Sequence, residues 1–403
     1  MKEISGAVTA PKGFSASGIH CGIRKSKTKK DLALILSATP ASAAAVYTCN
    51  LVKGAPLVVT KQNLSDGIAR AVICNSGNAN TCNADGEEIA NGVCSLLAKK
   101  LAISPSDVIV ASTGVIGQPL SLQPFADGMD DLVTHLTDSA DDAAEAIMTT
   151  DTHAKCVAVE FIVGGKTCRI GGIAKGSGMI HPNMATMLVF LTSDVKISAQ
   201  MLNKALGEDV KTSFNMVSVD GDTSTNDMLS ILANGMAGNE EITCENDDYS
   251  EFCKALHFVT VKLCRMIAKD GEGATKLLEC KISGALDDKN AKILAKSVIT
   301  SSLFKAAMFG ADANWGRVLC ALGYSGAQTD VNKIDVSFVS KVGSIAVCAN
   351  GAGLPFDEDI AKKILSQDEI IIDIHCKDGE SSAVAWGCDL TYDYVKINGD
   401  YRT

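Results

Sequence analysis

Proline and aromatic residues are scarce in this sequence, and long apolar runs are missing. Only eight of its 403 residues are proline and 5% are aromatic, against 35 glycines. This composition favours tightly packed α/β layers, in which neighbouring backbones approach closely. The apolar segments are short and interrupted by polar residues, so we expect none of them to span a membrane. The length suits one large domain or two.

Patterns that would hold a metal ion or a disulfide framework are also missing. The six histidines stand alone, and no two of them form an HxxxH pair. The fifteen cysteines are odd in number, are scattered from Cys21 to Cys388 and never form a CxxC motif, which indicates reduced, buried thiols. The acidic stretch Asp220–Asn226 lacks the glycine that a calcium-binding loop requires. We therefore predict no metal site.

Basic residues are outnumbered by acidic ones. The chain has 37 Lys and Arg against 47 Asp and Glu, a formal net charge of −10. This charge disfavours binding to nucleic acid and to anionic membranes, although it leaves room for a local basic pocket that holds a small anion. Residues 1–14 have neither the apolar core of a signal peptide nor the arginine-rich character of a transit peptide. We predict a cytoplasmic protein.

Short β-branched runs alternate with helical patterns from the start of the chain. Leu32–Ser37, Pro56–Thr60 and Ala71–Asn75 are predicted as strands, and Gly86–Lys100 as an amphipathic helix. The alternation continues without a linker that would separate two independent halves. The sequence therefore predicts an α/β fold.

Two regions of this pattern bear on function. Cys156–Val163 and Lys166–Ala174 are predicted to form a hairpin through two glycines, which brings Lys175 close to Thr152. Near the C-terminus, Val395–Ile397 is predicted as a last strand, which would tie the end of the chain into a sheet.

The stretch Lys175–Asp194 is the first candidate for a catalytic site. Its glycine-rich loop leads to Thr186, which follows the small residue Ala185 at the start of an apolar run. Cleavage before such a threonine would release an amine that can activate the threonine hydroxyl. The alternative is an ordinary threonine where a loop enters a core strand.

Two further positions have side chains or backbone groups suited to catalysis. The predicted strand Asp107–Ser112 ends at Thr113 and Gly114, whose hydroxyl and backbone NH groups could stabilise an oxyanion. Glu272 stands between two glycines and could meet an ammonium group. A common turn and a solvated surface glutamate are the alternative interpretations.

Taken together, eight segments resemble the ornithine acetyltransferase family, the glutamate N-acetyltransferases of arginine biosynthesis. The resemblance covers the whole chain. The segments that carry it are GAVTAPKGF (Gly6–Phe14), CNSGNANTC (Cys74–Cys82), STGVIG (Ser112–Gly117), TTDT (Thr149–Thr152), KGSGMIHPNMATML (Lys175–Leu188), GEGATK (Gly271–Lys276), DANWGR (Asp312–Arg317) and INGDYRT (Ile397–Thr403).

This resemblance implies an α/β (α+β) fold of stacked layers and a precursor that cuts itself between Ala185 and Thr186. The two interlocked fragments would be an N-terminal fragment of residues 1–185 and a C-terminal fragment of residues 186–403, assembled as two copies of the pair. Thr186 would be the nucleophile, with Thr113 and Gly114 as the oxyanion hole. The implied substrate-binding residues are Thr152, Lys175, Thr186, Glu272, Asn398 and Thr403.

The implied reaction moves an acetyl group from N2-acetylornithine to glutamate. By hypothesis, Lys175 or Thr152 holds the substrate carboxylate and Glu272 faces the ammonium, while Asn398 and Thr403 complete the pocket. The amine of a new N-terminal Thr186 would serve as base, and an acetyl-threonine intermediate would give ping-pong kinetics. No cofactor is expected. The sequence leaves open whether acetyl-CoA is a second acetyl donor.

Two other functions would use the same residues. An amidohydrolase or aminopeptidase with a processed N-terminal threonine would pass the acyl group to water, and would release ornithine without glutamate. A non-catalytic protein that binds small anions through Lys175 would bind its ligand with an uncut chain.

Overall fold

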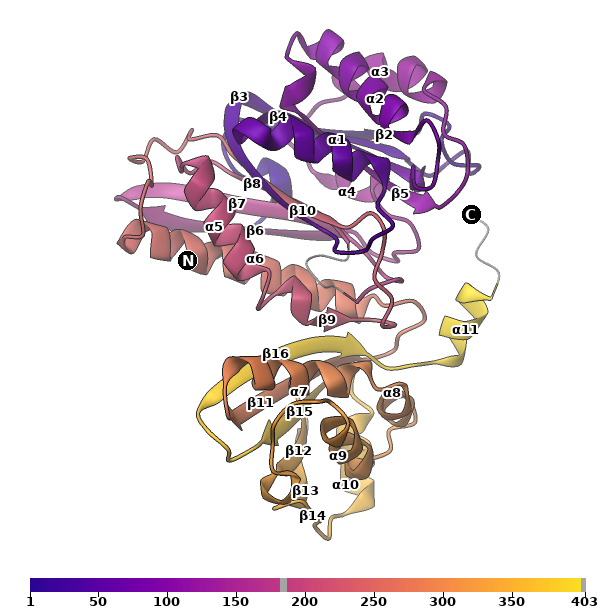
Figure 1. Cartoon of the computed structure of the whole chain (residues 1–403), viewed down its shortest axis with the longest axis vertical. Coiled ribbons are helices and arrows are strands. Elements are labelled where there is room, and N and C mark those ends of the chain that lie inside the picture. The colour runs from indigo at the N-terminus through magenta and orange to yellow at the C-terminus, as the bar shows by residue number, and fades with distance from the viewer. Residues whose placement is uncertain (182–186, 400–403) are drawn as a thin grey trace.

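The structure is a computed structural model that describes residues 1–181 and 187–399 (Figure 1). These residues form two β-sheets with helices packed on them, so the predicted α/β fold of stacked layers is confirmed. The larger sheet has nine strands and the smaller one has seven.

The larger sheet is built mainly from the first 233 residues. Its strands lie in the order β1 (Lys2–Ile4), β6 (Lys155–Val163), β7 (Lys166–Lys175), β8 (Leu188–Ser193), β10 (Met228–Ala233), β3 (Leu32–Tyr47), β4 (Ile68–Asn78) and β5 (Val108–Val115), with β2 (Phe14–Ile19) paired to β3. Strands β8 and β10 are parallel neighbours, and Leu188 pairs with Met228. Segments from both sides of residues 182–186 therefore share one sheet.

The smaller sheet comes from the second half of the chain. Its strands lie in the order β14 (Ala352–Gly353), β13 (Gly343–Ala349), β12 (Asp335–Ser340), β15 (Glu369–His375), β11 (Leu277–Ala285), β16 (Ser381–Cys388) and β9 (Val217–Ser218). The helices of the chain are α1 (Ala55–Asn63), α2 (Gly86–Leu101), α3 (Gln123–Thr134), α4 (Asp141–Ala146), α5 (Ala199–Asp209), α6 (Asp247–Lys269), α7 (Asp288–Thr300), α8 (Ser302–Phe309), α9 (Trp315–Gly323), α10 (Glu358–Leu365) and α11 (Tyr392–Asn398).

Helix α6 joins the two sheets, because it packs on β6 and β7 of the larger sheet and on β16 and β11 of the smaller one (Figure 1). The Asn246 side chain caps its first turn by accepting a hydrogen bond of 2.9 Å from the Tyr249 NH. Its apolar side chains recur at helical spacing and are fully buried: Phe252, Leu256, Val259, Leu263 and Ile267. Burying each of them contributes about 1.5–3 kcal/mol, which holds the two sheets in one body.

Two predicted strands are helical. Pro56–Thr60 lies in α1, where Pro56 occupies the first turn and needs no NH partner. Val395–Ile397 lies in α11, whose N-cap Thr391 accepts a hydrogen bond of 3.3 Å from the Tyr394 NH. Both were short apolar runs, for which length and periodicity do not separate strand from helix.

The cysteines agree only in part with the prediction of reduced, buried thiols. All fifteen cysteines are free thiols, and eight of them are buried whereas four are exposed, so burial holds for only part of the set. Within residues 1–181 and 187–399, no helix is both long enough and apolar enough to cross a membrane.

Candidate active site

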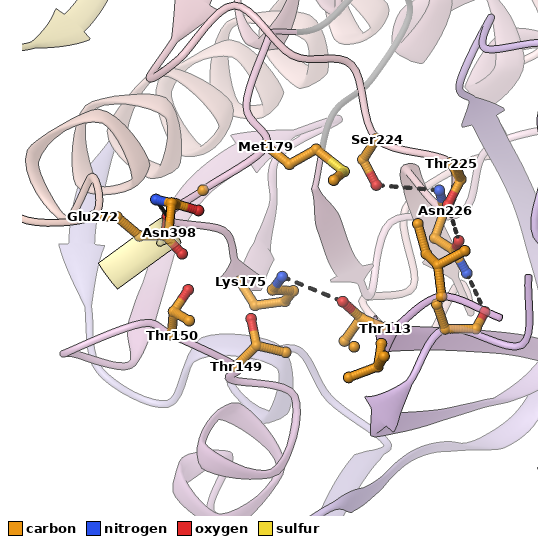
Figure 2. A pocket seen from close by; sticks show the side chains of 15 residues that line it. Thr113, Thr149, Thr150, Lys175, Met179, Ser224, Thr225, Asn226, Glu272 and Asn398 are labelled. Atoms are coloured by element: carbon orange, nitrogen blue, oxygen red, sulfur yellow. Dashed lines mark hydrogen bonds between the residues drawn. The ribbon is translucent and has the colours of Figure 1, made fainter. Parts of the chain in front are cut away.

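A cavity of about 260 Å³ lies where the larger sheet meets the loop after α6 and the C-terminal helix α11. Figure 2 shows its lining side chains. The structure brings five of the predicted site residues together in its wall, namely Thr113, Gly114, Lys175, Glu272 and Asn398. These residues are up to 285 positions apart, as counted from Thr113 to Asn398.

Lys175 provides the positive charge of the pocket. It is the last residue of β7 and is only 9% exposed. Its Nζ donates a hydrogen bond of 3.3 Å to Thr113 Oγ1 at the end of β5, as Figure 2 shows. An ammonium group with little access to water attracts an anionic ligand group strongly. The cation and the predicted oxyanion hole are therefore adjacent.

The backbone at Gly114 approaches β4 closely. Gly114 has φ +127°, a conformation that residues with a side chain rarely adopt, and its register partner is Gly77. A Cβ at Gly114 would lie 2.4 Å from the carbonyl carbon of Gly77. Glycine is required here because both the torsion angle and the strand spacing exclude a side chain.

Glu272 and Asn398 provide an acidic, hydrogen-bonding part of the same pocket. Asn398 Nδ2 donates a hydrogen bond of 2.7 Å to Glu272 Oε2. The Glu272 NH donates to the Ser177 carbonyl at 2.9 Å, which ties the loop after α6 to the loop after β7. Glu272 is 8% exposed, so its carboxylate faces the cavity rather than bulk water.

A buried ionic network lies beside Lys175. The Lys155 ammonium is 2.6 Å from a carboxylate oxygen of Asp151 and 2.6 Å from one of Asp270. Asp151 also accepts a hydrogen bond of 2.7 Å from the Gly176 NH, directly after Lys175. Burial opposes ionisation of Asp151, but Lys155 and Lys175 outweigh it and lower its pKa to about 2. The network thus fixes the backbone that carries Lys175.

Thr152 belongs to this network and is not among the residues that line the cavity. Its NH lies 3.1 Å from an oxygen of Asp270, and its hydroxyl donates to the same carboxylate. In this structure Thr152 positions Asp270, and its hydroxyl is already engaged.

The sequence profile of the ArgJ family matches residues 15–403. The chain belongs to the ArgJ family. It is 53% identical over 392 residues to arginine biosynthesis bifunctional protein ArgJ 1 of Clostridium acetobutylicum, covering 97% of this chain and 96% of that protein. It is 47% identical to the ArgJ protein of Bacillus subtilis, covering 100% of this chain and 98% of the other.

A solved ArgJ structure is also similar. The crystal structure of the Bacillus halodurans arginine biosynthesis bifunctional protein argJ has 43% sequence identity and a TM-score of 0.50. The match covers 52% of this chain and 97% of that one, so the solved chain corresponds to about half of the present sequence.

Several wall residues of this ArgJ-family pocket were not named as site residues from the sequence. Thr149 and Thr150 line the cavity, and Thr150 Oγ1 lies 2.6 Å from Ser177 Oγ. The segment Ser224–Asn226 lines it as well; its sequence does not suit a calcium-binding loop and is typical of a hydrogen-bonded turn that could line a site. The TTDT motif contains the signal for both threonines, although the resemblance assigns substrate binding only to its last residue, Thr152.

Ala185, Thr186 and Thr403 lie outside the residues that the structure describes, so their predicted roles remain predictions. Nearby described residues border the pocket or pair with strands beside it. Met179 lines the cavity, and the Met187 carbonyl accepts a hydrogen bond of 2.9 Å from the Met228 NH. Leu188, two positions after Thr186 in the sequence, is the register partner of Lys175.

His181 is expected to make the fold acid-sensitive. Burial and the nearby Lys296 ammonium together lower its pKa to about 4, although the Asp220 carboxylate acts in the opposite direction. The unfolded chain, with a histidine pKa near about 6.5, therefore binds the proton first, and stability falls as the pH drops from about 6.5 to about 4. A His181→Asn variant should lose part of this dependence in urea unfolding measured across that range.

His257 gives the control of opposite sign. The Asp209 carboxylate raises the pKa of His257, so its contribution is complete at low pH and is lost as the pH rises through the folded-state value. His257→Asn should therefore steepen the loss of stability in acid. Equal slopes for the wild type and His181→Asn would show that His181 is not the responsible group.

Proposed function

We propose that this chain is an acetyltransferase that moves the acetyl group of N2-acetylornithine to glutamate, in the cyclic route of arginine biosynthesis. The proposal is supported by the fact that three kinds of group line one pocket. They are the Lys175 ammonium, the hydroxyl and backbone NH groups of Thr113 and Gly114 that could form an oxyanion hole, and the Glu272 carboxylate. Membership of the ArgJ family and the names of its relatives support the reaction.

The charged groups of the substrate match the two ends of the pocket. N2-acetylornithine carries an α-carboxylate and a side-chain ammonium. Lys175 binds the carboxylate through a charge-assisted hydrogen bond, and Glu272, held by Asn398, binds the ammonium. Glutamate is the acceptor in the proposed reaction. Its α-amine takes the acetyl group, so this amine must lie at the acetyl carbonyl.

Thr186 is the proposed nucleophile, and it becomes the first residue of the fragment 186–403 when the chain cuts itself after Ala185. The new α-amine, with a reference pKa near about 8, takes the hydroxyl proton as the hydroxyl attacks the acetyl carbonyl. The Thr113 hydroxyl and the Gly114 NH stabilise the resulting oxyanion, and each such donor is worth roughly 3–4 kcal/mol. Support comes from the family resemblance and from the pairing of Leu188 with Lys175.

The exchange then has two half-reactions. Ornithine leaves with the proton from the base, and the amine of glutamate attacks the acetyl-threonine ester to regenerate the hydroxyl. The proposed reaction needs no cofactor. We place the enzyme in the cytoplasm. Its proposed assembly contains two copies of the pair formed by fragments 1–185 and 186–403. The relatives' names include the word "bifunctional". As the second activity of this chain we propose acetylation of glutamate by acetyl-CoA.

The test combines a gel, a sequencing run and a substrate exchange. Purified protein should run as two fragments under denaturing conditions, and the second should begin Thr-Met-Leu. With N2-acetylornithine, ornithine release should depend on glutamate. Release at the same rate without glutamate would instead favour the amidohydrolase or aminopeptidase reading, and an uncut chain that only binds the ligand would favour a binding protein.

Gly178→Ala tests the role of Glu272. A Cβ at Gly178 would lie 2.3 Å from Glu272 Oε2 and 2.5 Å from Oε1, so the carboxylate must move. We expect the KM for N2-acetylornithine to rise about tenfold, the loss of roughly one charge-assisted hydrogen bond, with a smaller change in kcat. Gly207→Ala in α5 is the matched control, because apart from the neighbouring residues and the helix's own backbone no atom lies within 4 Å of the added methyl group. Equal KM values in the two variants would contradict the role of Glu272.

A further inference from the structure

Five basic residues stand within the seven positions 24–30, which read RKSKTKK. This concentration contrasts with the formal charge of −10 for the whole chain. The segment joins β2 to β3 and is therefore anchored at both ends in the larger sheet. A cationic segment in an acidic protein can attract an anionic ligand to one place on the surface.

The segment borders a second cavity, of about 300 Å³, that adjoins the catalytic pocket. The two cavities share Gly114 and Thr149 as wall residues. The other residues around the second cavity are Ile23, Arg24, Lys25, Ser26, Lys29, Gly77 and Gln118. A ligand lying in the second cavity would thus have one end at the proposed oxyanion hole.

The segment is held in place by buried groups. The Asp31 carboxylate, with its residue fully buried, accepts hydrogen bonds from the NH groups of Cys21 at 2.7 Å and of Arg24 at 3.0 Å. The Arg24 guanidinium donates to the Ser76 carbonyl at 3.2 Å and also to the Met148 carbonyl. Arg24 is therefore part of the wall, whereas Lys25 and Lys29 bring exposed ammonium groups to the cavity.

We propose that this second cavity binds the phosphorylated nucleotide end of an acyl thioester of the coenzyme A class, with the acyl end at Thr113 and Gly114. The inference rests on the proposed function and names the site of its second acetyl donor. Lysine ammonium groups are suitable partners for phosphate oxygens. The catalytic pocket, at about 260 Å³, has room for an amino acid, so the nucleotide must lie outside it.

The chemical step needs no further reactant. The Thr186 hydroxyl attacks the thioester carbonyl, the C–S bond breaks, and the threonine ester forms while the thiol leaves with the hydroxyl proton. The amine of glutamate then attacks this ester, and the threonine hydroxyl is restored. Both donors lead to the same intermediate, but only the thioester uses the basic cavity.

A charge-reversal variant separates the two donors. In Lys25→Glu/Lys29→Glu, the KM for acetyl-coenzyme A should rise at least tenfold, because two acidic groups repel the phosphates. The KM for N2-acetylornithine should stay within twofold of the wild type. Removing the 3′-phosphate from the donor should weaken binding to the wild type and have a smaller effect on the variant.

The control makes the same change in net charge elsewhere. Lys27→Glu/Lys53→Glu alters two exposed lysines that do not line the cavity, and its KM for both donors should stay within twofold of the wild type. An equal rise in the control, or an unchanged KM in the test variant, overturns the inference. Exchange between N2-acetylornithine and glutamate without any turnover of acetyl-coenzyme A also overturns it, whereas absence of that exchange refutes the proposed function instead.

Discussion

Replacing Thr186 with alanine is expected to abolish both self-cleavage and acetyl transfer. The variant lacks the hydroxyl that we propose attacks the Ala185 carbonyl during cutting and the acetyl carbonyl during turnover. Without cutting, no α-amine forms to act as base. Loss of a nucleophile that acts together with its base lowers kcat by about 10⁴-fold or more in other enzymes. A single full-length band and no glutamate-dependent ornithine release are the expected readings.

A matched variant controls for damage to the fold. Thr167, in β7, is exposed, so Thr167→Ala should be cut and should keep its activity. Thr186→Ser should retain partial cleavage and transfer, because the hydroxyl is preserved. If Thr186→Ala is still cut and still transfers acetyl groups, Thr186 is not the nucleophile.

Lys155→Met is expected to have the largest effect on stability. Removal of its ammonium leaves the Asp151 and Asp270 carboxylates, 0% and 6% exposed in their side chains, without the cation between them. Breaking such a buried pair by removing one partner costs about 3–5 kcal/mol. Urea unfolding should show this loss as a lower midpoint, and acetyl transfer should fall because Asp151 also holds the Gly176 NH beside Lys175.

Two further variants test this explanation. Lys155→Met/Asp270→Asn should recover part of the lost stability, since one of the unpaired charges is removed. Lys166→Met, at the exposed first position of β7, should unfold like the wild type. The proposed importance of the network would be contradicted if the losses of unfolding free energy from Lys155→Met and Asp270→Asn simply added up in the double variant. A Lys155→Met protein as stable as the wild type would contradict it as well.

Helices and strands were predictable from the sequence where their apolar residues recur at regular spacing or where turn-forming residues mark their ends. The helix predicted at Gly86–Lys100 and the hairpin through Gly164 and Gly165 are both present. The register and order of the larger sheet were not predictable, because they depend on pairings between distant strands such as β10 and β3. The same holds for β3, which extends to Tyr47 and was predicted only as far as Ser37.

The candidate active-site pocket was predictable only in part. The resemblance selected residues that the structure places around one cavity, from Thr113 to Asn398. It did not reveal the ion pairs between Asp151, Lys155 and Asp270, although all three lie in or beside recognised motifs. A sequence gives the identity of charged residues, whereas their burial and mutual contact arise only when two distant loops meet.

The insertion of β8 and β10 between β7 and β3 has a consequence for how the protein is made. After a cut before Thr186, the two fragments would still be joined by backbone hydrogen bonds between β7 and β8 and between β10 and β3. The pieces would remain one particle, since parting them would expose open strand edges prone to aggregation. Halves synthesised separately would carry those edges from the outset. We therefore expect folding to precede any cut, so that the two polypeptides would behave as a nicked single domain rather than as exchangeable subunits.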